Sequence, residues 1–543
     1  MIANIKKFVT QSSRNSIAAA AIIVAFFGIA SRLLGVVRDR ILAAQYGAGD
    51  TLDVYYAAFR LPDLTFELLV VGALGAAFIP VFTNLIAHKD RERAWQCANG
   101  VFVVVVLLLL FVSIFGIIFA PFIIHVIVPG FPEAKMMQAV SLSRVMFLGP
   151  IFLTASAVLG GILVSFRRFW VYSTAPIFYN LGIIIGVKFF TPHIGIIGLA
   201  WGVVLGSLMH FIVHVIAVRP LGFRFHMPLL SSYKNPDVIQ TMRLMVPRMF
   251  SSASNQLSLL FVSFFASTLA AGSLTIFTFA NNVQSVVLGL IGVPFAVAAF
   301  PVLSHKYSVG DHDAFVGVLS QTLRRILYYS VPLSMIFFVL REQIVRIVFG
   351  AGHFNLENTI MTYQILGILC LSLFAQSVIP LLARGFYAMQ DTKTPFYIAL
   401  ISQVINVCLL LALIRRYELY AIAIAFSVTA VINALVMFIY LHRTVDEPEY
   451  KDTLRTFMQI VMATFIAIIF TFLSRDYIGS LVPLQYVWGV LTQLVGAGAI
   501  GAVVYLFVTA VFGVREYETI KKKIIIKMFG RPHVANEEQT IAR

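Results

Sequence analysis

The sequence predicts an all-α integral membrane protein with about fourteen transmembrane helices, and three observations lead to this fold class. The 543 residues are 60% hydrophobic and only 12% charged, whereas soluble domains contain about 25% charged residues. Apolar stretches of roughly 20 residues, each long enough to cross a bilayer, recur along the whole chain. These stretches lack the alternation of a barrel strand, so they are expected to satisfy their backbone groups as helices.

The expected spans follow one another with short polar connections between them. The first begins with a basic segment, as a signal peptide does, but it continues past Arg32, so we interpret it as an uncleaved span. The expected ranges are 16–46, 53–87, 97–128, 136–164, 171–190, 195–218, 238–270, 273–303, 318–349, 358–388, 395–414, 418–441, 454–474 and 484–512.

An internal repeat at an offset of roughly 220 residues groups most of these spans. The motif AAFIPV at 76–81, for example, recurs as AAFPV at 298–302. We therefore expect two parallel halves of about six spans each, an N-lobe and a C-lobe around a central cavity. The expected organisation is N-lobe 1–220, C-lobe 221–445, two extra C-terminal spans within 446–514, and a basic tail at 515–543.

The positive charge of the chain is distributed as membrane topology requires. A net charge of +16 would suggest a nucleic-acid partner in a soluble protein, but here the Lys and Arg residues lie in short loops between apolar runs. Alternate connections are basic, with Arg415 and Arg416 as exceptions. This pattern predicts cytoplasmic N- and C-termini and no nucleic-acid partner.

Ionisable residues inside the expected spans are concentrated in the first two. A charge at the bilayer centre costs about 2.5–3.5 kcal/mol, so such residues usually face water or a partner. Either they pair and lock the two helices together, or the excess of arginine on the first span recognises an anionic substrate such as a pyrophosphate. The residues concerned are Arg32, Arg38 and Asp39 on the first span and Asp53, Arg60, Asp63 and Glu67 on the second.

Other chemistry-bearing residues give weaker signals. His210 and His214, four residues apart, fit either a proton relay or helix packing, and we favour packing. Cys97, Cys370 and Cys408 have neither disulfide nor zinc spacing. The sequence contains no nucleophile motif, nucleotide-binding loop or metal-ligand spacing, so we expect a transporter without cofactor or metal and not an enzyme.

Several motifs resemble those of the MurJ (MviN) family of lipid II flippases, which belongs to the multidrug/oligosaccharidyl-lipid/polysaccharide (MOP) exporter superfamily. They are SRLLGVVRD at 31–39, YGAG at 46–49, FRLPD at 59–63, AFIP at 77–80, and GFY with QDTKTP between 385 and 395. The resemblance covers most of the chain and implies that the two extra C-terminal spans within 446–514 form a lipid-tail groove. It implies an alternating-access carrier in the plasma membrane that moves lipid II, an undecaprenyl-pyrophosphate-linked peptidoglycan precursor, from the cytoplasmic to the outer leaflet.

The resemblance also implies roles for individual residues. Arg32, Arg38 and Asp53 match positions that the family needs in its cavity, and Arg60 and Asn282 are further candidates for substrate binding. Asp39, Asp63 and Glu67 are candidates for ion pairing or coupling. The implied partners are lipid II or a related polyprenyl-pyrophosphate glycolipid, membrane lipids and cell-wall synthesis proteins.

The sequence departs from the family at three positions. Phe66 and Asn282 stand where the family often has arginine, and Ser285 stands where it often has an acid. These differences leave less positive charge in the second half of the cavity. We therefore predict that either the contacts with the headgroup or the substrate itself differs from the family pattern.

Three other functions remain open on the sequence. An exporter of another polyprenyl-linked oligosaccharide would need the same cationic cavity with other sugar contacts. A cation-coupled drug antiporter of the same superfamily would rely on acidic residues, such as Asp53, Asp63 and Glu67. A membrane scaffold that binds cell-wall enzymes would not transport at all.

Overall fold

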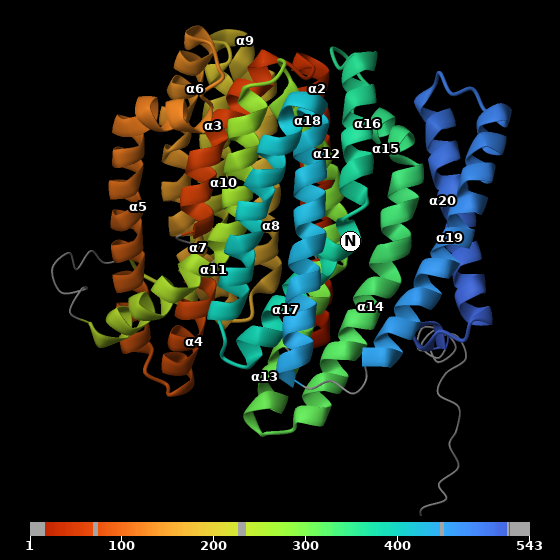
Figure 1. Cartoon of the computed structure of the whole chain (residues 1–543). Helices are drawn as coiled ribbons and strands as arrows, with labels where there is room; N and C mark the ends of the chain where they lie inside the picture. Colours follow the sequence, from red (N-terminus) through yellow and green to blue (C-terminus); the bar gives the residue numbers. More distant parts are fainter. Residues whose placement is uncertain (1–16, 69–73, 226–234, 446–449, 519–520, 522–543) are drawn as a thin grey trace, which may run out of the picture. The chain divides into compact units, whose positions relative to one another are not determined.

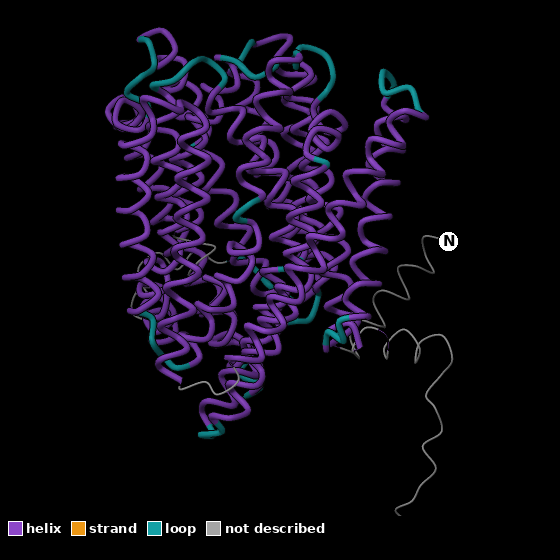
Figure 2. The backbone as a smooth tube through the Cα atoms, turned by 45° about the vertical axis from the view of Figure 1, so that its right-hand side comes forward, coloured by secondary structure: helices purple, strands orange, loops and turns teal. Residues whose placement is uncertain are grey.

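The structure, a computed structural model, describes residues 17–68, 74–225, 235–445, 450–518 and 521. Helices make up nearly all of these residues, and no strand occurs among them (Figure 2). The basic residues that precede position 17 and the lysines after position 521 lie outside the described residues. The predicted all-α fold class is confirmed.

Helices lie along every one of the expected spans, although several spans are broken into two (Figure 1). In the first part of the chain they are α2 (Ile17–Tyr46), α3 (Asp50–Phe66), α4 (Leu74–Ala87), α5 (Arg91–Ile127), α6 (Glu133–Met146), α7 (Leu148–Ser165), α8 (Phe169–Ile185), η2 (Gly186–Phe190), α9 (Thr191–Ile194), α10 (Ile197–Val218), η3 (Arg219–Leu221), α11 (Pro236–Ser267) and α12 (Ser273–Leu290). They continue with α13 (Gly292–Ser308), α14 (His312–Val339), α15 (Arg341–Phe349), α16 (Leu356–Cys370), α17 (Leu373–Ala388), α18 (Lys393–Val445), α19 (Tyr450–Leu481) and α20 (Val487–Val511).

The number of membrane spans is only partly established by helix length and composition. Among the described residues, eight helices are long and apolar enough to cross a membrane, or nine if the bent pair α16 and α17 counts as one span. One of the eight is α18, whose 53 residues would extend about 80 Å, far more than one bilayer crossing. Its backbone breaks at Glu418, where φ is 47°, which agrees with the expected division into spans 395–414 and 418–441. The total of about fourteen spans stays a prediction.

The described residues divide into two compact units. The first contains those within Met1–Val286, Val345–Leu369 and Thr392–Asn433, and the second those within Val287–Ile344, Cys370–Asp391 and Ala434–Arg543. The candidate residues on α2, α3 and α12 all belong to the first unit. The expected N-lobe and C-lobe, with their boundary after residue 220, stay a prediction.

Glycines allow α8 and α10 to pack closely in the first unit (Figure 1). A Cβ atom at Gly182 on α8 would overlap the backbone of Gly206, and one at Gly186, the first residue of η2, would overlap the backbone of Gly202. Small residues let helix backbones approach in membranes, where packing replaces the hydrophobic effect as the driving force. Because α8 also packs against α2, this contact helps to fix the helix that carries Arg32 and Arg38.

Gly182→Ala should therefore destabilise the protein, by about 1–3 kcal/mol, because backbone atoms cannot move aside as a flexible side chain can. Gly317→Ala, also within a helix, is the matched control, since no atom lies within 4 Å of a Cβ built there. Thermal unfolding in detergent measures both. Equal unfolding temperatures for the two variants would show that the close approach of α8 and α10 is unimportant.

In the second unit, α14 packs against α19 and α20 (Figure 1). The Arg324 Nε and Glu516 Oε1 atoms form a buried ion pair at 3.3 Å, and the Tyr505 hydroxyl donates to the Tyr328 carbonyl oxygen at 2.8 Å. A cavity of about 430 Å³ is lined here by apolar and aromatic side chains, among them Phe295, Leu333, Ile336 and Leu506. The last expected span, α20, thus contributes Ala502, Tyr505 and Leu506 to an apolar cavity within this unit.

Candidate functional site

A chain of polar contacts crosses the middle of α2. The Arg38 Nε and Nη2 atoms donate to Asp39 Oδ1 at 2.9 and 2.8 Å, and Nη1 donates to Asn180 Oδ1 on α8 at 3.0 Å. The other carboxylate oxygen of Asp39 accepts a hydrogen bond from Asn282 Nδ2 on α12 at 2.9 Å. The Arg38 side chain is 21% exposed and that of Asp39 only 4%. The charge of Arg38 is therefore compensated locally, while its side chain stays partly exposed.

Arg32, almost two helical turns earlier, lies in a different environment. Its side chain is exposed, and its Nη1 atom donates to the Ser285 carbonyl oxygen on α12 at 3.1 Å. Among the described residues, no carboxylate lies within 4.0 Å of this guanidinium. Arg32 thus offers a full positive charge and unused N–H donors, which is what an anionic headgroup requires.

Arg60 on α3 is held by hydroxyl groups. Its Nε atom donates to Ser263 Oγ on α11 at 2.9 Å, and Nη2 donates to Thr278 Oγ1 on α12 at 3.3 Å. Hydroxyl oxygens orient a guanidinium without neutralising it. In the described part of the chain Arg60 has no ion-pair partner, so it retains its positive charge.

Asp53 is buried and fully engaged by protein groups. Its Oδ1 atom accepts hydrogen bonds from the Thr275 amide and hydroxyl, at 2.9 and 2.7 Å. Its Oδ2 atom accepts one from the Gly272 amide at 2.8 Å, and Lys135 Nζ lies 3.3 Å from it. Asp53 therefore caps the N-terminus of α12, where orphan amides and the helix dipole favour a negative charge. In this conformation Asp53 connects α3 to α12. A substrate could reach the carboxylate oxygens only by displacing the protein groups that are bound to them.

The other positions named from the sequence lie on α3, at its C-terminal end, and on α12. Asp63 and Glu67 are half-buried near the end of α3. Phe66, in the position where an arginine is typical of the resembling family, packs against the hydrophobic cluster formed by α4, α5 and α7. Asn282 is bound to Asp39, and its carbonyl oxygen accepts a hydrogen bond from Ser285 Oγ at 2.8 Å.

Two contributors were missed by the sequence reasoning. Asn180 contacts Arg38, and Lys135 contacts Asp53. The amide of Asn180 stands within an otherwise apolar span, which is a signal that could have been noticed. Lys135 lies in a connection between apolar runs, and nothing in its local sequence indicates contact with Asp53.

His210 and His214 lie away from these arginines on α10. Both Nδ1 atoms are within hydrogen-bond distance of Ser156 Oγ, at 2.7 and 2.8 Å, and the His214 ring stacks on Tyr172. The observed neighbours of the pair are thus neutral groups, as in a packing contact. All three cysteines are free thiols.

Comparison with known proteins identifies the family. The family model described as lipid II flippase MurJ matches residues 42–492. The chain is 31% identical to a probable lipid II flippase MurJ of Rhizobium meliloti (strain 1021) over 421 residues, which cover 76% of this chain and 78% of the relative. It is 28% identical to the probable lipid II flippase MurJ of Rhizobium tropici over 530 residues, or 94% of this chain and 97% of that one.

Solved structures agree at the level of the fold. A lipid II flippase MurJ in an inward closed conformation superposes with a TM-score of 0.73 at 24% identity, covering 92% of this chain and all of that one (100%). An inward-facing multidrug resistance transporter of the MATE family, in the MOP superfamily, gives a TM-score of 0.63 at 15% identity, over 78% of this chain and 98% of the other. With the apolar helices and the family match together, the chain is a multi-pass membrane protein that belongs to the lipid II flippase MurJ family.

Proposed function

We propose that this protein flips lipid II, or a closely related polyprenyl-pyrophosphate glycolipid, from the cytoplasmic to the outer leaflet of the plasma membrane by alternating access. The family match supports the substrate class. The observation that carries the proposal is the exposed Arg32 guanidinium, which has no carboxylate partner among the described residues. A diphosphate would supply the missing negative charge.

Three arginines contact the headgroup, each in a different way. Arg32 binds the diphosphate directly, because its charge and donors are available. Arg38, held between Asp39 and Asn180, presents its exposed edge as a second and weaker contact. Arg60, oriented by two hydroxyls, is a third cation for a headgroup that has moved farther along α3. Asn282 holds Asp39 in place and adds a hydrogen-bond donor without charge.

Alternating access requires that the contacts typical of one conformation break in the other. The cap of Asp53 on the N-terminus of α12 is such a contact, because it joins α3 to a helix more than 200 residues later in the chain. Its three hydrogen bonds from α12 stabilise the conformation described here. Opening on the opposite side of the membrane would break these hydrogen bonds between Asp53 and the N-terminus of α12. The free energy of substrate binding would offset the stability that is lost with them.

The polyprenyl tail stays in lipid during transport. The apolar cavity of about 430 Å³ in the second unit, lined by α14 and α20, is suited to a hydrocarbon chain. A long tail kept in such a groove need not cross the polar path taken by the headgroup. Cell-wall synthesis proteins that make or consume lipid II are the expected partners, and the basic loops predict that both termini are cytoplasmic.

A complementation test examines this proposal. The gene is expressed in a bacterial strain depleted of its own lipid II flippase, and purified protein is assayed in proteoliposomes for the accessibility of lipid II in each leaflet. Rescue of growth together with flipping of lipid II supports the proposed function. Correct membrane insertion with neither result would overturn it, and rescue without flipping would point to a non-transporting scaffold.

A second candidate is an exporter of another polyprenyl-linked oligosaccharide, and the contacts of Phe66 and Asn282 favour it. Phe66 packs in a hydrophobic cluster, and Asn282 binds Asp39, so neither position adds positive charge. The same complementation is therefore repeated with Phe66→Arg and Asn282→Arg. Rescue only after arginine is introduced would show that the natural substrate has a different headgroup.

A further inference from the structure

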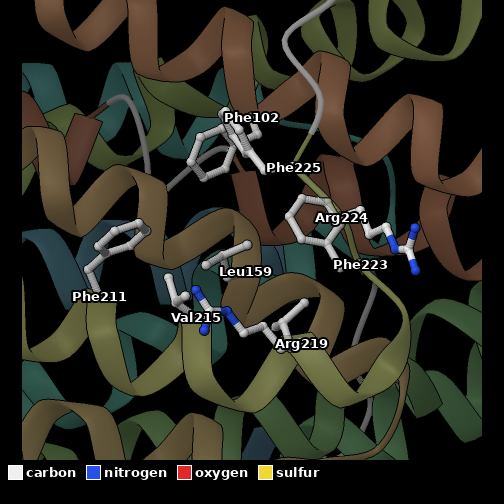
Figure 3. Close-up of a pocket in the computed structure, with 9 residues that line it drawn as sticks. Phe102, Leu159, Phe211, Val215, Arg219, Phe223, Arg224 and Phe225 are labelled. Atoms are coloured by element: carbon white, nitrogen blue, oxygen red, sulfur yellow. The ribbon is translucent and has the colours of Figure 1, made fainter.

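A second cavity lies in the first unit, at the ends of α5, α7 and α10. Its volume is about 640 Å³, within the range of roughly 300–1,000 Å³ that is usual for small-molecule sites. Figure 3 shows the side chains that line it. Most of them are aromatic or aliphatic: Phe102, Leu159, Phe211, Val215, Phe223 and Phe225.

The cavity lies along the last turns of α10, whose residues Phe211, Val215 and Val218 line it. From Phe211 to Val218 this helix rises by about 10 Å, and both residues line the cavity. Phe102 and Phe225 meet edge to face at 4.9 Å between ring centroids and form part of the wall. The apolar lining therefore reaches from the end of the span into the depth expected for the bilayer, where an acyl chain lies.

A positive charge lies where α10 ends. Arg219 and Arg224 belong to the cavity lining, and both are exposed. In Figure 3 the Arg219 side chain reaches back toward Val215, whereas the Arg224 guanidinium points away from the phenylalanines. The Arg219 side chain makes no hydrogen bond or ion pair within the described ranges. The cationic end is on the side that the basic loops predict to be cytoplasmic.

We propose that this cavity binds an anionic phospholipid of the cytoplasmic leaflet, with one acyl chain between the phenylalanines and its phosphate on Arg219. The apolar wall of the cavity matches the acyl chain of such a lipid, and the cationic end matches its phosphate. A guanidinium is the side chain best suited to phosphate, and the cytoplasmic leaflet is the one enriched in anionic lipids. A zwitterionic lipid would fit the apolar wall equally but would gain less from the arginine. This site is separate from the candidate residues on α2, α3 and α12.

Binding of phosphatidylglycerol tests the proposal without any lipid II, so its outcome does not depend on the proposed function. Purified protein is titrated with short-chain phosphatidylglycerol, and binding is followed by native mass spectrometry. Arg219→Gln should raise the dissociation constant about tenfold, since a hydrogen bond to a charged group is lost. Arg416→Gln, which removes another exposed arginine, is the control of equal net charge and should bind like the wild type.

A second variant tests the acyl part of the site. Val215→Trp fills the cavity while Arg219 stays in place, and it should also weaken phosphatidylglycerol binding about tenfold or more. Phosphatidylcholine should bind more weakly than phosphatidylglycerol to the wild type, and inorganic phosphate should not compete. Equal binding by Arg219→Gln and Arg416→Gln, unchanged binding by Val215→Trp, or displacement by inorganic phosphate would each overturn the assignment.

Discussion

Arg32→Ala should lower the rate of lipid II flipping by at least about 30-fold, because losing a charged partner of a bound phosphate costs roughly 2 kcal/mol or more. The stability of the folded protein should be almost unchanged by this substitution. Arg32 is exposed, and its observed contact with the rest of the chain is one hydrogen bond to a carbonyl oxygen. Flipping in proteoliposomes and thermal unfolding in detergent measure the two effects separately.

Two comparisons make the Arg32 result specific. Arg32→Lys keeps the charge but loses the forked pair of donors, so its flipping rate should lie between those of alanine and wild type. Arg416→Ala removes an exposed arginine elsewhere and should flip normally. Wild-type flipping by Arg32→Ala would show that this guanidinium does not bind the headgroup, and the assignment of the site would then fail.

Arg38→Ala should also lower the rate of flipping and, in contrast to Arg32→Ala, should destabilise the protein by about 3–5 kcal/mol. The reason is Asp39, whose carboxylate is buried beside Arg38 and would lose its counter-charge. Asn282 would remain as one hydrogen-bond donor, which does not neutralise an ionised carboxylate. Unfolding temperature and membrane insertion are measured together with transport.

The double variant Arg38→Ala with Asp39→Asn separates stability from transport. It removes both charges, so the buried carboxylate no longer needs a partner, and much of the lost stability should return. Flipping should stay low, because the second cation near the headgroup is still absent. If the double variant flips at the wild-type rate, Arg38 acts only as the partner of Asp39. If it is as unstable as the single variant, the pairing does not explain the destabilisation.

The environment of the acidic residues bears on the drug-antiporter alternative. A cation-coupled antiporter needs a carboxylate that its substrate or coupling ion can reach. Asp39 is held by Arg38 and Asn282, and Asp53 by Lys135 and the N-terminus of α12. These two acids are therefore occupied in the described conformation, which favours the arginines as substrate ligands. The likeness to MATE transporters is a likeness of fold.

The sequence by itself determined the fold class, the positions of the helices and the family. Each depends on properties that a short segment carries alone: the length of an apolar run, the charge of a loop, or a motif such as FRLPD at 59–63. The concentration of arginines on α2 was also visible, because placing charges in an apolar segment is costly wherever the segment folds.

The tertiary structure decided what each of these charges does. Asp53 caps α12 through Gly272 and Thr275, and the Arg38 guanidinium is oriented by a hydrogen bond to Asn180 on α8. These partners lie more than 100 residues away in the chain, so no local pattern specifies them. A guanidinium is free or neutralised according to which helices pack beside it. That packing depends on the fit of whole helix surfaces, such as the glycine contact of α8 with α10.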